Sequence, residues 1–190
     1  IGNYQVTAIK ALHAPALGSL NYIIEQGGKS MLYLLDSDEY QRVMVFVNTK
    51  DMTQRLCKRL QNAGYPAECL HGDMRQSARN QVMQGYRKGK FQILLATDVA
   101  ARGIDVDDVE CVINFDVPAE NEYYVHRIGR TGRAKRKGVA WSIIGNFPEK
   151  AKLDEIAKYS NYHIKPMLLG ADGSLTEEEV KAPVVKKRFR

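Results

Sequence analysis

Apolar residues in the middle of the chain switch repeatedly between the spacings of buried strands and of amphipathic helices. Residues 43–47 form an uninterrupted apolar run, which is typical of a strand buried on both faces. Residues 50–63 then repeat apolar side chains every four positions, the spacing of one helix face. The same reasoning predicts strands at 43–47, 67–70, 92–95, 111–115 and 139–144, and helices at 50–63, 76–87, 123–127 and 149–159.

Strands that alternate with helices of this length predict an α/β fold, with a parallel sheet flanked by helices on both faces in a single domain. We expect the strand at 139–144 to close the sheet and residues 97–105 to form a loop. The first 40 residues are less regular, with a possible strand near 22–24 and helix near 29–35. The predicted organisation is a lead-in at 1–40, the domain at 41–168 and a flexible tail at 169–190.

The amino-acid composition indicates which kinds of binding partner and which cellular compartment to expect. A net charge of +6 and a pI near 9.2 favour polyanionic partners. The three cysteines are far apart and the four histidines are scattered, so we expect neither disulfides nor a metal site. Such cysteine usage favours a reducing compartment, and we expect a cytoplasmic protein, or a nuclear one in a eukaryote. We expect no membrane association, because there is no long apolar run and no signal-peptide pattern.

Two polar segments carry candidate chemistry. Residues 96–105 read ATDVAARGID and follow a predicted strand, where ligands bind in parallel sheets. Residues 126–133 read HRIGRTGR, with three arginines and two glycines in eight positions. Arginine presents a planar fork that grips phosphate oxygens, and glycine allows close approach of the backbone. A solvated basic surface is the alternative for an isolated arginine-rich segment, but the two segments together favour a phosphate-binding edge.

Four segments together resemble the second RecA-like domain of DEAD-box ATP-dependent RNA helicases. Residues 45–49 (VFVNT) are similar to motif IV, and residues 70–79 (LHGDMRQSAR) contain the QxxR element. Residues 96–105 match motif V and residues 126–133 match motif VI, in the family's order. The resemblance covers about residues 43 to 144, with a weaker echo at 152–156. Tyr86, where the family often has phenylalanine, is one departure.

The resemblance implies roles around ATP. Arg130 and Arg133 would act as arginine fingers, stabilising charge on the transferred phosphoryl group. Asp105 would accept a hydrogen bond from the ribose, and Gly103 would lie beside the nucleotide.

The same resemblance implies that His126 and Arg127 hold motif VI in place and link it to a partner domain. A local hydrogen bond at a helix end is the alternative role of His126. Asp98 is interpreted as a bracket for the motif V loop, and Tyr123 and Tyr124 as packing beside motif VI.

The resemblance also implies RNA contacts through hydroxyls, arginines and backbone amides. Such groups bind phosphate and sugar without reading sequence. Arg79 has a competing structural role, in which it pairs with Asp73 or with a neighbouring loop. The implied RNA contacts are Thr49, Gly72, Gln76, Arg79, Thr97, Arg102 and Gly103.

The chain lacks a GxxxxGK[ST] phosphate loop and an Asp-Glu-Ala-Asp run, which hold ATP and Mg²⁺ on the first domain of the family. Because it also begins at Ile1 without methionine, we expect a monomeric fragment, inactive alone, whose partners are RNA and the N-terminal RecA-like domain. One alternative is a stand-alone RNA-binding or protein-docking module without ATPase activity. Another is half of a DNA helicase or translocase, which the QxxR element and the complete motif V disfavour.

Overall fold

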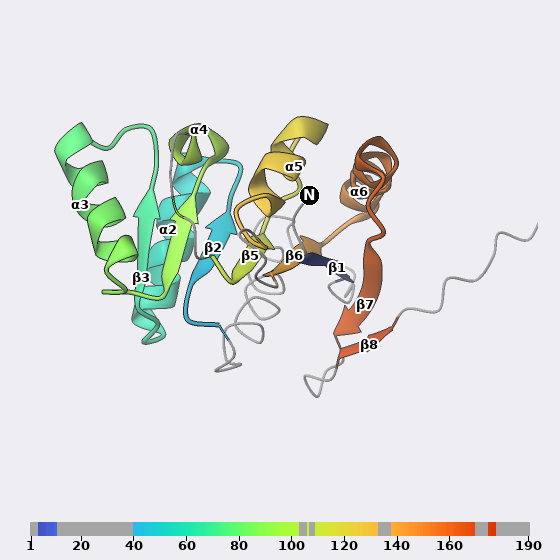
Figure 1. Ribbon diagram of the computed structural model, residues 1–190, viewed down its shortest axis with the longest axis horizontal. Coiled ribbons are helices and arrows are strands. Elements are labelled where there is room, and N and C mark those ends of the chain that lie inside the picture. Colours follow the sequence, from blue (N-terminus) through green and yellow to red (C-terminus); the bar gives the residue numbers. More distant parts are fainter. Residues whose placement is uncertain are drawn as a thin grey trace, which may run out of the picture.

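A computed structural model describes residues 4–10, 40–102, 106, 109–132, 138–169 and 175–177. Their strands form one sheet in the order β3-β4-β2-β5-β6-β1-β7-β8 (Figure 1). All pairings are parallel except that of β7 with β8. The strands are β1 Tyr4–Lys10, β2 Val43–Phe46, β3 Ala67–Leu70, β4 Ile93–Ala96, β5 Cys111–Asn114, β6 Gly138–Ile144, β7 Lys165–Leu169 and β8 Leu175–Glu177.

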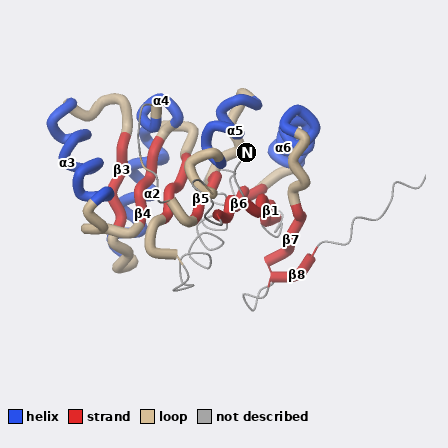
Figure 2. The backbone as a smooth tube through the Cα atoms, in the orientation of Figure 1, coloured by secondary structure: helices blue, strands red, loops and turns tan. Residues whose placement is uncertain are grey.

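Helices cover both faces of the sheet, which confirms the predicted α/β fold. Alternate residues of the buried strand β2 pack into separate cores: Val43 and Val45 contact the α2 side, whereas Met44 and Phe46 face the other helices. In Figure 2, α3 stands near the β3 edge, and α5 and α6 follow along the same face. The helices are α2 Lys50–Asn62, α3 Gln76–Arg87, α4 Asp98–Ala101, α5 Asn121–Ile128 and α6 Phe147–Ser160.

Two predictions about the sheet and its loops were wrong. Residues 97–105 were expected to form a loop, but α4 occupies Asp98–Ala101, with the Thr97 hydroxyl accepting a bond from the Ala100 amide. The strand at 139–144 does not close the sheet, because β1 pairs in parallel with β6 and is followed by β7 and β8. These flanking strands come from both ends of the chain, where the hydrophobic pattern was judged irregular.

The structure also bears on the chain ends. Leu175–Glu177 lie in the segment expected to be a flexible tail, but they form β8 against β7. The possible strand at 22–24 and helix at 29–35 lie outside the described residues. No helix in the described part of the chain is long and apolar enough to span a bilayer.

The Tyr86 side chain explains one departure from the family pattern. It is fully buried, its hydroxyl donates to the Val43 carbonyl at 3.0 Å, and its ring stacks on Phe91. Burial raises the pKa of the phenol above its usual value. The hydroxyl that phenylalanine lacks therefore ties α3 to the start of β2.

Candidate functional site

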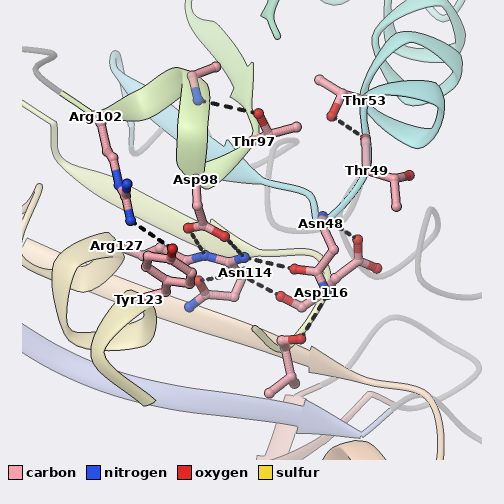
Figure 3. Close-up of polar contacts among 12 residues, drawn as sticks. Asn48, Thr49, Thr53, Thr97, Asp98, Arg102, Asn114, Asp116, Tyr123 and Arg127 are labelled. Carbon is pink, nitrogen blue, oxygen red and sulfur yellow. Dashed lines mark hydrogen bonds and ion pairs between the residues drawn. The ribbon is translucent and has the colours of Figure 1, made fainter. Parts of the chain in front are cut away.

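The candidate site lies at the edge of the sheet where β2, β4 and β5 end. Because these three strands are parallel neighbours, the residues that follow them converge: Asn48 after β2, Asp98 after β4 and Asp116 after β5. The helix α5 approaches the same edge and brings Arg127 into contact with all three (Figure 3). The site is therefore assembled from segments far apart in the sequence.

Arg127 is the centre of this site, although its side chain is only 1% exposed. Its Nε and Nη2 donate to the two carboxylate oxygens of Asp98, each at 2.7 Å. Nη2 also donates to Asn48 Oδ1 at 2.8 Å, and Nη1 donates to the Asp116 carbonyl at 2.7 Å. The guanidinium lies over the Phe46 ring, 5.2 Å from its centroid. A buried charge is tolerated only with such compensation, so Arg127 acts as a structural clamp.

Two roles were expected of Arg127, holding motif VI in place and linking it to a partner domain, and its burial fits the first. It holds motif VI against the ends of the strands, but the hydrogen bonds of its side chain lie within this domain. A link to a partner domain would need an exposed group. His126, the next residue back on α5, is exposed and remains available for such a contact.

Asn48 and Asp116 extend the clamp. The Asn48 amide N–H donates to Asp116 Oδ2 at 2.8 Å, and the Asn48 side chain donates to the Val117 carbonyl at 2.9 Å. Burial raises the pKa of Asp116, and the Asn48 amide and Arg127 oppose that rise. Arg127 Nη1 also donates to Asn114 Oδ1, at 3.5 Å. The sequence analysis did not identify Asn48, Asn114 and Asp116 as partners of Arg127. Their position directly after or at the end of predicted strands was the available signal.

Asp98 forms the bracket that was expected of it, since its carboxylate binds Arg127. The two threonines implied in RNA contact are both helix N-caps. Thr49 accepts from the Met52 amide at 3.3 Å and is exposed, whereas Thr97 caps α4 and is 9% exposed. A hydroxyl that accepts in this way keeps its own hydrogen for another partner.

Arg79 joins the loop that follows β3 to the helix α4. Its guanidinium donates to the His71 carbonyl at 3.4 Å and to the Ala100 carbonyl at 3.1 Å. Of the two structural alternatives, contact with a neighbouring loop is therefore the one observed. Asp73 pairs instead with Lys50, at 2.6 Å.

The remaining RNA candidates lie at the surface. Gln76 donates to Asn80 within α3, and Gly72 has open space where a side chain would project. Arg102 donates to the Tyr123 hydroxyl at 2.7 Å and stacks on its ring.

Arg130 is half-buried and lines a small hollow between α4 and α5 together with Arg102, Tyr123 and His126. Three candidates, Gly103, Asp105 and Arg133, lie outside the described residues. Within the described ranges no group of three or more His, Cys, Asp or Glu side chains could hold a metal ion.

Comparison with known proteins identifies the family. Residues 28–135, more than half of the chain, match the helicase conserved C-terminal domain. The chain belongs to this family. More narrowly, it is the C-terminal RecA-like domain of the DEAD-box RNA helicase group, as its relatives and structural neighbours establish.

One such relative is the ATP-dependent RNA helicase DeaD of Buchnera aphidicola, 40% identical over 152 residues, covering 80% of this chain and 25% of the relative. Escherichia coli DEAD-box protein SrmB, solved bound to regulator of ribonuclease activity A, superposes with a TM-score of 0.77 at 34% identity, covering 86% of this chain and 90% of the solved SrmB chain. Saccharomyces cerevisiae Dbp5 L327V bound to RNA and ADP BeF3 also gives a TM-score of 0.77, at 27% identity, covering 88% of this chain and 42% of the solved Dbp5 chain.

This chain spans a third or less of the length of the curated relatives that it matches. It covers 25% of the Buchnera aphidicola protein DeaD and 33% of the Kluyveromyces lactis protein FAL1. Those relatives are named ATP-dependent RNA helicases. The family assignment therefore covers one domain of a larger type of protein.

Proposed function

We propose that this chain works as the second half of an ATP-dependent RNA helicase, supplying arginine fingers and half of an RNA groove. The observation that supports this most is the Arg127 clamp. It joins Asn48, beside the RNA candidate Thr49, to Asp98, beside the RNA candidate Thr97. The same arginine lies three residues before Arg130 on the chain, so the clamp connects the RNA candidates Thr49 and Thr97 with the ATP candidate Arg130.

The ATP side of the proposal depends on a first RecA-like domain. That domain would hold the triphosphate and Mg²⁺, and Asp105 and Gly103 of this chain would contact the ribose side. Arg130 and Arg133 would approach the phosphates across the cleft between the domains. Arginine fingers are worth ~10³–10⁵ in rate in other phosphoryl-transfer systems.

The RNA side would bind phosphate and sugar. Thr49 and Thr97 offer hydroxyls, Gly72 offers a backbone amide without a side chain, and Arg79 and Arg102 offer guanidinium groups. Such contacts position a strand without reading its bases. The solved yeast Dbp5 chain, part of which has the same fold as this chain, is bound to both RNA and ADP BeF3. That observation supports a role for this fold in a protein that binds both ligands.

Domain closure would connect the two sides. ATP and RNA would bind at the seam and draw the domains together, which brings the arginines onto the phosphates and bends one RNA strand. Short duplexes would open locally, and hydrolysis with phosphate loss would reopen the cleft.

The test is RNA-stimulated ATP hydrolysis by the protein that joins this chain to a first RecA-like domain, in one polypeptide or mixed in trans. Arg130→Ala or Arg133→Ala should lower kcat by about 10² or more, while RNA affinity is largely kept. Lys150→Ala is a matched control, because Lys150 is an exposed cation on α6 that pairs with Asp154 on the same helix. Unchanged turnover in both arginine variants would leave the chain as an RNA-binding or docking module.

A further inference from the structure

Arg102 and Tyr123 are joined by two interactions across the site. Arg102, which caps the end of α4, donates from Nη2 to the Tyr123 hydroxyl at 2.7 Å. Its guanidinium carbon also lies 5.3 Å from the centroid of the Tyr123 ring (Figure 3). The hydrogen bond and the cation–π contact together hold the charged head against α5.

This contact turns Arg102 toward α5, whereas the RNA candidates Gln76 and Arg79 lie on α3. Arg102 borders two hollows of the surface. One is a groove of about 470 Å³ along α3, which Gln76 and Arg79 also line. The other is the small hollow lined by Tyr123, His126 and Arg130. The same guanidinium thus borders both the RNA candidates and motif VI.

We propose that Tyr123 sets the RNA affinity of the domain by competing with an RNA phosphate for Arg102. The inference rests on the proposed function, in which Arg102 contacts RNA. A phosphate pairs with a guanidinium through charge-assisted bonds, which are stronger than a bond to a neutral phenol. An RNA phosphate therefore displaces the Tyr123 hydroxyl from Arg102. Because the Arg102–Tyr123 hydrogen bond is lost in this exchange, RNA binds more weakly than it would to a free Arg102.

Movement of Arg102 from Tyr123 to RNA would also affect motif VI. His126 lies three residues after Tyr123 on α5, and residues at this spacing share a helix face. Withdrawal of Arg102 opens the hollow that Tyr123, His126 and Arg130 line together. Tyr123 is thus a positioning residue, whose hydroxyl couples RNA binding to the segment that carries Arg130.

Tyr123→Phe tests the competition directly, because it keeps the ring and removes only the acceptor of the hydrogen bond. The dissociation constant of this chain for a short fluorescein-labelled oligouridylate, measured by anisotropy at low ionic strength, should fall about two- to tenfold. A merely structural role would weaken binding instead. Tyr159→Phe is the matched control, since Tyr159 is exposed and its hydroxyl donates to Glu122 at 3.5 Å.

A double-mutant cycle with Arg102→Ala decides whether the effect passes through the arginine. Arg102→Ala alone should weaken RNA binding, and Tyr123→Phe should change nothing further in that background. Unchanged or weaker binding by Tyr123→Phe, or an equal gain without Arg102, overturns the inference while leaving the proposed function intact. An Arg102→Ala variant with normal affinity would instead contradict the proposed RNA contact itself.

A kinetic readout extends the test once the first RecA-like domain is supplied. Tyr123→Phe should lower the RNA concentration that gives half-maximal ATPase stimulation and raise the turnover without RNA. If both values match those of the unsubstituted protein, the proposed coupling to motif VI is rejected.

Discussion

Arg127 on α5 and Asp98 on α4 form a two-pronged ion pair, with both N–O distances at 2.7 Å. Their side chains are 1% and 17% exposed, so solvent and salt screen the pair little. The pair links motif V to motif VI. It therefore connects the segment that includes Thr97 and Arg102 with the segment that includes Arg130.

Breaking this pair should destabilise the domain strongly. Asp98→Ala leaves the buried guanidinium without its counter-charge, and loss of one partner of a buried pair typically costs about 3–5 kcal/mol. Urea unfolding followed by circular dichroism measures the change. Asp154→Ala is the control, because its pair with Lys150 is exposed and should contribute about 0.5 kcal/mol or less. Equal effects of the two variants would contradict the clamp.

The buried hydroxyl of Tyr86 should contribute measurably to stability. Tyr86→Phe removes the bond to the Val43 carbonyl without changing the ring that stacks on Phe91. We expect the free energy of unfolding to fall by about 1 kcal/mol. The same denaturant titration applies, and a more stable variant would show that the family's phenylalanine suits this core better.

Gly72→Ala should separate RNA binding from folding. A Cβ at this exposed position meets no atom within 4 Å, so the free energy of unfolding should change by less than about 0.5 kcal/mol. If RNA approaches the backbone here, the added methyl group should still weaken RNA binding in the anisotropy assay. Normal affinity would remove Gly72 from the proposed groove.

Asp116 should make stability depend on pH in an unusual direction for a carboxylate. Burial raises its pKa in the folded protein, so the folded state holds the proton more tightly than the unfolded state. Its contribution to stability is therefore greatest at acidic pH and declines as pH rises from about 4, the unfolded value, through the raised folded value.

Asp116→Asn isolates that contribution, because the amide oxygen can still accept from the Asn48 amide. The variant should gain stability relative to the unsubstituted chain between about pH 4 and neutral pH. Urea titrations of both proteins across this range give the difference, and a difference that shrinks toward neutral pH would refute the assignment.

The central elements could be predicted from the sequence because their residues report burial locally. β3 at Ala67–Leu70 and α3 at Gln76–Arg87 match the predicted bounds, since an apolar period and flanking turn residues are properties of short segments. The order of the four motifs was enough to indicate the family. The roles of Arg130, Arg133 and Asp105 in ATP chemistry stay predictions.

The partners of individual side chains, by contrast, depend on how distant segments meet. Arg79 had two structural alternatives in the sequence, and only the position of α4 beside the His71 loop decided between Asp73 and a loop carbonyl.

By itself the sequence determined the alternating helices and strands, the parallel sheet and the family, because periodicity and motif order are local. Only the tertiary structure decided that β1 lies between β6 and β7, and that the Arg127 side chain turns inward. Parallel strands align their carboxyl ends whatever their distance along the chain, so Asn48, Asp98 and Asp116 meet around one guanidinium. The sequence marks these residues as following strands, but their meeting depends on which strands are neighbours in the sheet, and no local pattern encodes that order.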